Sequence, residues 1–429
     1  MKKIVIKLLA LFSRRIIKKY QPKVIGISGS IGKTGVKEYI EFILKNKFRV
    51  RASIKNYNNE FGLPLSIIGI ISPGKNIWGW FKVFGQALKL LIIKDKNYPE
   101  VLVLEMGIDR IGDMDYLLSI IKPDIGILTN ISHSHIEYFG TLEQIKKEKS
   151  KLLKNLNKNG MAILNSDNSY LKELVPELKN ITLSYGLNEG ADFRAKDISF
   201  VLPEDLLQAD FYGINFKLEH EGSVVPINLS RAVSYSSIYS ALASLAVGFS
   251  LGLNIIEMAE YLNNIVPIIG RMNILPGIKN SIIIDDTYNA SPESTLNALK
   301  TMEVIPKTMG RKIVILGDML ELGDYSDEGH CVVGKKIAEM KIDALFLIGS
   351  LAEKIGQTAI KFGFDRNNVF NFSKTEDAVE FIKNGILSND LIMVKASQGM
   401  RLEKIVKTIM LEPKKADKLL VRQGVEWQN

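Results

Sequence analysis

The sequence predicts an α/β protein built from two units. The first is expected to hold a mostly parallel sheet with a small antiparallel section, and the second is expected to be a C-terminal Rossmann-like α/β domain. Short apolar runs alternate with helical patterns from Lys23 onward, as in parallel sheets covered by helices, and the same rhythm restarts after residue 270. A chain of 429 residues can bury about two or three separate cores.

Residues 1–22 are expected to form a basic amphipathic helix. Their apolar residues recur at helical spacing at Ile4, Leu8, Leu11, Phe12 and Ile16. Such a helix either packs on the body, which we favour, or makes peripheral contact with an anionic membrane face. Lys7 interrupts the apolar run and no small-residue cleavage site follows, which argues against a signal peptide. A second apolar stretch, residues 77–93, contains Lys82, Gln86 and Lys89 and is too short and too polar to span a membrane.

The remaining elements follow in order along the chain. Strands of the first unit are expected at KVIGIS, VLVLEMG, DIGILTNI and MAILNSD, and helices at VKEYIEFILKN and TLEQIKKEKSKLLKNL. A more polar alternation from Thr182 to Leu229 predicts the antiparallel section, and SIYSALASLAVGFSLGL predicts a long helix. Strands of the second unit are expected at SIIIDDTYN, RKIVILGDM, DALFLIG and DLIMVKAS. We therefore place domains at residues 23–268 and 269–429, preceded by the helix at 1–22.

Charge and cysteine content narrow the class of partner. The net charge of +9 favours anionic partners. Zinc-finger spacing, aromatic RNA-reading motifs and long basic blocks are missing from the sequence, so phosphorylated small molecules are favoured over nucleic acid. The single Cys331 excludes an internal disulfide framework and indicates a reducing compartment, which favours the cytoplasm.

The stretch GISGSIGKTGVKEYI, residues 26–40, has the form of a phosphate-binding loop between a strand and a helix. The residues that would bind nucleotide are Gly29, Ser30, Gly32, Lys33 and Thr34. Backbone N–H groups at a helix N-terminus bind phosphate oxygens, Lys33 would reach the terminal phosphates, and the Thr34 hydroxyl would bind magnesium. A strict P-loop pattern would have glycine at Ile27, and this shorter motif alone is as often structural as functional.

Polar residues follow several strands of both units. Glu105 ends VLVLEMG beside the phosphate loop, where an acid can bind magnesium or cap the next helix, and His133 and His135 follow the next strand. Open α/β sheets bind ligands at this edge. Arg271 and Asp286 stand at the junction of the two units and at a strand end beyond it. The sequence therefore predicts a ligand cleft between the units.

These motifs carry a resemblance. The ordered set GSIGKT, NYNNEFGLPLS, LEMG, TNISHSHIEYFGTLEQI, GRMN, IDDTYNASPES, LGDMLELG and KASQGMRLEKIV resembles the Mur ligase family from about Lys23 to Ile409. The resemblance is strongest to the branch that adds D-alanyl-D-alanine to UDP-N-acetylmuramoyl-tripeptide. It implies an ATP-dependent, amide-forming ligase of cell-wall precursor synthesis that works through an acyl phosphate. The family's phosphate loop is this short form, so Ile27 fits it.

The resemblance also implies roles for individual residues. Lys33 and Thr34 would bind the phosphates of ATP and a first Mg²⁺ together with Glu105, and His135 would bind a second Mg²⁺. Lys149 would react with carbon dioxide to become a carbamate, an oxygen ligand for a hard cation. Without the resemblance, the lysine run around Lys149 reads as a solvated helix face. The remaining implied contacts are Arg271 to phosphate, Asp286 and Asn289 to nucleotide or dipeptide, and Asn58 and Asn59 to the acceptor peptide.

Three departures from the family pattern keep alternatives open. Only about 25 residues precede the phosphate loop, so the family's N-terminal uridine-binding domain is expected to be absent. Ser237 and Ser240 stand where asparagines are usual, and Gln398 stands where arginine is usual. The alternatives are a ligase for another acceptor, such as a lipid-linked precursor or a polyglutamate-like chain, and a non-catalytic nucleotide-binding relative. A monomer is expected.

Overall fold

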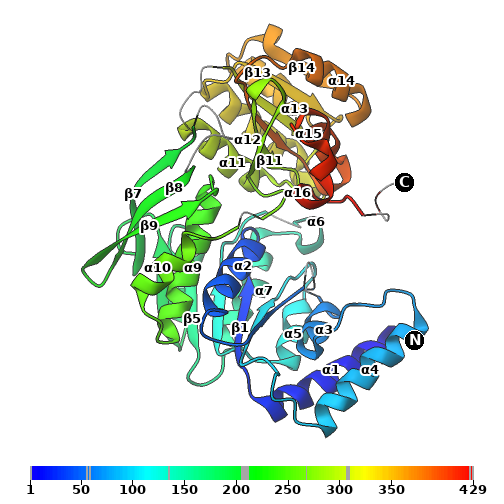
Figure 1. Cartoon of the computed structure of the whole chain (residues 1–429), viewed down its shortest axis with the longest axis vertical. Helices are drawn as coiled ribbons and strands as arrows, with labels where there is room; N and C mark the ends of the chain where they lie inside the picture. Colours follow the sequence, from blue (N-terminus) through cyan, green and yellow to red (C-terminus); the bar gives the residue numbers. More distant parts are fainter. Residues whose placement is uncertain are drawn as a thin grey trace.

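The computed structural model describes residues 2–54, 57, 59–133, 136–203, 212–266, 268–305, 310–424 and 427. Two sheets, each covered by helices on both faces, lie one beyond the other along the long axis (Figure 1). The predicted α/β fold with a large, mostly parallel sheet and a second sheet is confirmed.

The first sheet has the strand order β2-β3-β1-β4-β5-β6-β7-β8-β9 in the described part of the chain. Its strands are β1 (Lys23–Ser28), β2 (Val50–Ala52), β3 (Val101–Glu105), β4 (Ile125–Leu128), β5 (Met161–Asn165), β6 (Ile181–Gly186), β7 (Phe193–Val201), β8 (Gly213–His220) and β9 (Ser223–Ser230). Strands β1 to β6 pair in parallel, so their carboxyl ends share one edge.

The antiparallel section is shorter than predicted. Among the described strands of the first sheet, only β7, β8 and β9 pair antiparallel, whereas β6 is parallel to both of its neighbours, so the prediction was wrong for the residues of β6. The chain between β5 and β6 contains α8 (Ser169–Lys172) and a turn of 3₁₀ helix, which returns it to the same end of the sheet. Such a crossover joins parallel strands.

Helices cover both faces of the first sheet, because residues on its strands point alternately to opposite sides. Ile25 and Ile27 of β1 contact one buried cluster, and Val24 contacts the other. The first cluster contains α2 (Lys33–Leu44), α9 (Tyr235–Ser250) and α10 (Ile255–Leu262). The second contains α1 (Lys2–Tyr20), α3 (Gly62–Ile68), α4 (Ile77–Ile92), α5 (Asp113–Ile120), α6 (Ile136–Phe139) and α7 (Leu142–Lys154).

The second sheet has the order β10-β11-β15-β12-β13-β14, and of its described strands only β10 is antiparallel to its neighbour. Its strands are β10 (Asn273–Pro276), β11 (Ile282–Asp286), β12 (Lys312–Gly317), β13 (Ala344–Ile348), β14 (Val369–Phe372) and β15 (Leu391–Lys395). One face is covered by α11 (Pro292–Val304), α12 (Ser326–Glu339) and α13 (Glu353–Lys361). The other face is covered by α14 (Thr375–Gly385), α15 (Glu403–Ile409) and α16 (Ala416–Leu419).

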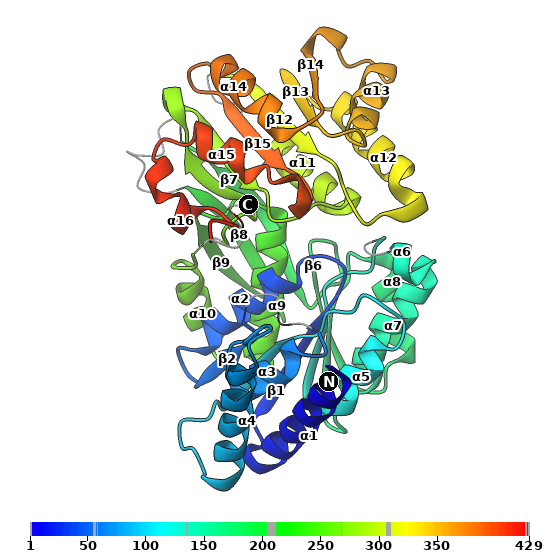
Figure 2. The same cartoon turned by 90° about the vertical axis from the view of Figure 1, so that its right-hand side faces the viewer.

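The predicted N-terminal helix is present as α1 and lies alongside α4 in both views (Figures 1 and 2). It buries Leu9, Ala10, Ser13 and Ile16 against the body. The predicted apolar face was partly wrong, because Ile4, Leu8 and Leu11 are 64%, 38% and 39% exposed. None of the helices in the described ranges is both long and apolar enough to cross a membrane.

Candidate active site

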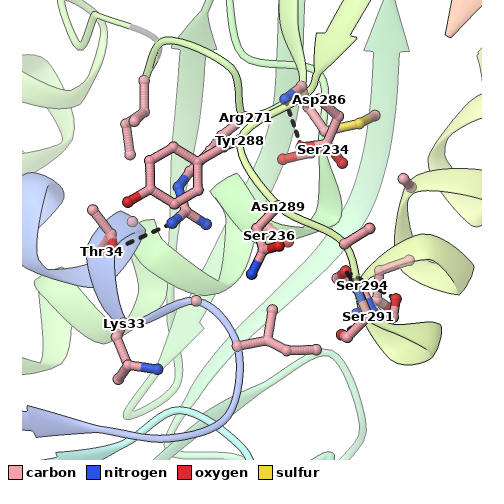
Figure 3. A pocket seen from close by; sticks show the side chains of 18 of the residues that line it. Lys33, Thr34, Ser234, Ser236, Arg271, Asp286, Tyr288, Asn289, Ser291 and Ser294 are labelled. Carbon is pink, nitrogen blue, oxygen red and sulfur yellow. Dashed lines mark hydrogen bonds between the residues drawn. The ribbon is translucent and has the colours of Figure 1, made fainter. Parts of the chain in front are cut away.

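A pocket of about 380 Å³ lies where the carboxyl edge of the first sheet faces the second unit (Figure 3). Both units contribute to its walls. The predicted residues that line it are Ser30, Gly32, Lys33, Thr34, Glu105, Arg271, Asp286 and Asn289. Residues from both units, distant in the sequence, therefore meet in one cavity, as expected for the predicted cleft.

The phosphate loop turns sharply between β1 and α2. Gly29 has φ of +144°, and a Cβ there would lie 2.0 Å from Oγ1 of Thr129. Gly32 has φ of +85° and precedes the first turn of α2. Both positions require glycine, because side chains strain a left-handed backbone and Gly29 has no room for one. Ile27, by contrast, is fully buried within β1, so the missing glycine of the strict motif falls in the strand core.

Hydrogen bonds hold this loop against the segment that follows β4. The Ser30 N–H donates to the Asn130 carbonyl oxygen at 3.0 Å, and the Ile31 N–H donates to Asn130 Oδ1 at 2.7 Å. Lys33 Nζ folds back and donates to the Gly29 carbonyl oxygen at 2.8 Å. Burial lowers the pKa of Lys33, with the nearby Glu105 carboxylate opposing that effect. These hydrogen bonds fix the shape of the loop.

Thr34, Glu105 and Arg271 form a continuous polar contact across the pocket. Thr34 Oγ1 donates to Glu105 Oε2 at 3.3 Å, and Arg271 Nη2 donates to Thr34 Oγ1 at 3.4 Å. The Arg271 guanidinium lies over the Tyr288 ring at 4.1 Å, which fixes its plane (Figure 3). Arg271 Nε is buried with no hydrogen-bond partner among the described residues, so this side chain keeps an unused donor.

The oxygens of Thr34 and Glu105 are suited to a small hard cation. Glu105 is 3% exposed, and its carboxylate faces a hydroxyl beside the loop that would hold phosphates. Mg²⁺ is usually bound by one or two such protein oxygens and completed by phosphate and water. The described ranges contain no cluster of three or more His, Cys, Asp and Glu side chains.

Lys149 on α7 is buried directly behind the phosphate loop. It is 2% exposed, and its Nζ donates to the Gly29 carbonyl oxygen at 3.2 Å. Three neighbouring lysines of α7 behave differently, since they form salt bridges with acids: Lys146 with Glu173, Lys151 with Asp115 and Glu148, and Lys154 with Glu177. The prediction of a solvated face was therefore wrong for Lys149, which the fold separates from the rest of the run.

Burial lowers the pKa of Lys149 well below its ordinary value, and the ammonium of Lys33 lowers it further. Both amines donate to the same carbonyl oxygen, so two positive charges there would repel each other. An amine in this setting is available as the neutral form, which is a nucleophile.

The far wall of the pocket contains a buried ion pair that sequence reasoning missed. Lys395 Nζ donates to Asp286 Oδ2 at 2.6 Å and to the Asn289 carbonyl oxygen at 2.9 Å. Asn289 Oδ1 accepts from the Gln398 N–H at 3.3 Å. Lys395 ends β15, which pairs with β11, so the register Asp286↔Lys395 brings the two charges together. The signal available in the sequence was a lysine at the end of a predicted strand.

Serines at the start of α9 form another wall that was only partly anticipated. The residues are Ser234, Ser236, Ser237 and Ser240. Ser240 Oγ donates to the Ser236 carbonyl oxygen at 2.8 Å, and a Cβ at Gly35 would lie 2.7 Å from it. Helices α2 and α9 therefore approach closely here, where a small side chain fits.

His133 joins the two units at the rim. Its Nδ1 lies 3.0 Å from Glu293 Oε1, and its ring stacks on Tyr325 with centroids 4.4 Å apart. Glu293 and Tyr325 belong to the second unit. His133, in the first unit, therefore contacts the second unit.

The remaining predicted residues fall outside this description or in a turn. His135 and Asn58 lie outside the described residues. Asn59 Oδ1 accepts hydrogen bonds from the N–H groups of Phe61 and Gly62 at 3.2 Å and 3.1 Å, which holds the turn before α3. Its predicted contact with the acceptor peptide stays a prediction.

Both units of the chain match domains of known proteins. Residues 85–234 match the Mur ligase middle domain, and residues 270–398 match the Mur ligase, glutamate ligase domain. The UDP-N-acetylmuramoyl-tripeptide--D-alanyl-D-alanine ligase of Bacillus subtilis is 30% identical over 397 residues, which are 91% of this chain and 76% of that protein. The enzyme of the same name from Escherichia coli is 25% identical over 392 residues, 90% of this chain and 76% of that protein.

The solved structures give the same result. The crystal structure of MurF ligase from Thermotoga maritima in complex with ADP has a TM-score of 0.76 and 28% identity, over 96% of this chain and 84% of that one. Since a relative at this level of identity matches nearly the whole chain, and both units match domains of one family, the chain belongs to the Mur ligase family.

Proposed function

We propose that this Mur ligase forms an amide bond between D-alanyl-D-alanine and UDP-N-acetylmuramoyl-tripeptide at the expense of ATP, in peptidoglycan precursor synthesis. The observation that supports it most is the hydrogen-bonded set of Thr34, Glu105 and Arg271 in a pocket lined by both units. A ligase of this kind must bring a nucleotide, a carboxylate and an amine together, and such a pocket allows it. We propose further that the protein acts as a cytoplasmic monomer, with domains at residues 23–268 and 269–429.

ATP would bind at the phosphate loop. The backbone N–H groups of Gly32, Lys33 and Thr34 lie at the N-terminus of α2, and helix N-termini favour anions. Lys33 would release the Gly29 carbonyl and turn to the terminal phosphates, where its charge offsets the charge of the transferred group. Arg271 would bind the same group from the opposite wall through its guanidinium, which lies beside Thr34.

Thr34 and Glu105 would hold the first Mg²⁺, and the carbamate of Lys149 together with His135 would hold the second. Mg²⁺ supplies charge stabilisation of the phosphoryl group when bound. The carbamate forms when the neutral amine of Lys149 attacks the carbon of CO₂, creating an N–C bond while the nitrogen loses one proton to solvent. This step gives Lys149 a negative charge that attracts Lys33, whereas a protonated Lys149 would repel it.

The reaction would proceed in two steps. The acceptor carboxylate attacks the terminal phosphorus, ADP leaves, and an acyl phosphate forms. The amine of the dipeptide then attacks the acyl carbon, its nitrogen loses one proton to solvent, and phosphate leaves as the tetrahedral intermediate collapses to the amide. Lys33 and Arg271 would hold the phosphoryl group through both steps, and Asp286 and Asn289 would position the nucleotide or the incoming dipeptide. Asn58 and Asn59 would contact the acceptor peptide.

Phosphate release by the purified protein tests the proposal. Release should require ATP, UDP-N-acetylmuramoyl-tripeptide and D-alanyl-D-alanine together, and mass spectrometry should find the joined product. Release that is indifferent to the dipeptide would contradict it. Turnover only with a lipid-linked precursor or a polyglutamate-like chain would retain the ligase chemistry and replace the acceptor, and ATP binding without turnover with any of these acceptors would indicate a non-catalytic relative.

A further inference from the structure

The outer surface of α1 and α4 has an apolar centre with basic edges. Helix α4 exposes one stripe at helical spacing: Trp78, Phe81, Leu88 and Ile92, which are 78%, 65%, 47% and 79% exposed. Helix α1 exposes a second stripe, Ile4, Leu8 and Leu11. Single exposed apolar residues are ordinary, but two adjoining stripes are not.

Contacts between the helices establish that these stripes adjoin. Phe12 contacts Phe84 with ring centroids 6.0 Å apart, and Lys19 Nζ donates to the Leu90 carbonyl oxygen at 2.8 Å. Residue numbers rise together along both helices, so α1 and α4 run parallel, side by side (Figures 1 and 2).

Helical geometry then fixes the outward faces. At about 100° per residue, Ile4, Leu8 and Leu11 lie on α1 between the side that contacts α4 and the solvent side. The same geometry places Phe81, Leu88 and Ile92 between the α1 side of α4 and solvent. The two stripes therefore form one continuous outer face, which we call the α1/α4 platform.

Basic residues flank this platform on both outer sides. On α1 they are Lys3, Lys7, Arg14 and Lys18, and on α4 they are Lys82 and Lys89, all exposed. Residues 2–20 and residues 71–94 together contain eleven Lys and Arg residues and neither Asp nor Glu. An apolar centre between cationic edges complements a surface that is apolar inside and anionic at its face.

We propose that the α1/α4 platform docks the protein peripherally on anionic lipid bilayers. The apolar stripes enter the boundary between headgroups and acyl chains, and the flanking lysines and arginines contact anionic headgroups. Trp78 suits this depth, because indole rings partition to the membrane interface. A second copy of the chain fits less well, because an isologous contact would bring two basic surfaces together. The proposal is independent of the ligase activity.

Co-sedimentation with vesicles tests this directly. The full chain should bind vesicles of phosphatidylcholine mixed with phosphatidylglycerol, and binding should weaken as salt is added. Trp78→Glu should weaken binding more than about tenfold, because it places a charge in the apolar centre. Lys82→Glu should weaken it about tenfold or more through lost attraction and new repulsion. Phe362→Glu is the control, since Phe362 is 53% exposed but lies beside α13 in the second unit.

Several results would overturn the proposal. They are no binding to anionic vesicles, equal binding to pure phosphatidylcholine, and binding that Trp78→Glu leaves intact. Light scattering that finds a dimer abolished by Trp78→Glu would assign the platform to a second copy instead. Phosphate release in solution should be the same in all variants and the wild type, which shows that they fold and separates this result from that of the ligase proposal.

Discussion

Replacing Lys149 by methionine should reduce the ligase rate by about 100-fold. Lys33 Nζ and Lys149 Nζ lie 2.8 Å and 3.2 Å from the same Gly29 oxygen, so they are at most about 6 Å apart. At that separation two unit charges interact by about 3 kcal/mol at an effective dielectric constant of about 20, which corresponds to about 100-fold in rate. The variant loses this attraction because methionine cannot form a carbamate. Methionine suits the buried site, so Tm should not fall.

The assay is phosphate release at saturating concentrations of all three substrates. Lys154→Met is the matched control, because Lys154 lies on the same helix in an exposed salt bridge with Glu177, and it should retain wild-type activity. Wild-type activity should fall in CO₂-depleted buffer and return with bicarbonate, and ¹³C-bicarbonate should give a carbamate NMR signal that Lys149→Met lacks. Wild-type rates in Lys149→Met, or activity indifferent to CO₂, would refute the reasoning.

Two further substitutions test the loop and a buried acid. Gly29→Ala should weaken ATP binding more than about tenfold, because its Cβ would overlap Thr129 Oγ1 in a left-handed backbone. Gly140→Ala is the control and should leave ATP binding unchanged, because Gly140 also has a positive φ, +77°, but faces open space. Calorimetric titration with ATP distinguishes the two variants. Burial raises the pKa of the Asp285 carboxyl to about 7. The protonated carboxyl therefore contributes fully to the stability of the fold below its ordinary pKa, and this contribution is lost as the pH rises through about 7. Asp285→Asn should therefore gain up to about 4 kcal/mol relative to wild type between about pH 4 and pH 8 in urea unfolding, and a difference that does not change with pH would contradict this.

Local patterns predicted much of the fold and several of the residues that line the pocket. The alternation of strands and helices and the phosphate loop depend on residues close in sequence, so both were readable. The direction of β6 could not be predicted from the sequence, because it depends on which strand β6 pairs with. The exposed side of α1 was misjudged because an amphipathic pattern does not say which neighbour, here α4, covers it.

Two residues of the site depend on contacts between distant segments, so local sequence patterns do not identify them. Lys149 stands among five lysines of one helix, and only the fold shows that it alone lies behind the loop. Lys395 meets Asp286 through strand register, over 109 residues of separation. The resemblance to the family identified Lys149, whereas local sequence patterns identified neither Lys149 nor Lys395.

The contact of His133 with Glu293 has a consequence for how substrates enter. Any rotation of the C-terminal domain away from the first must break this hydrogen bond and separate the His133 ring from Tyr325. Pocket opening and release of the strand-end segment behind the phosphate loop are therefore one event.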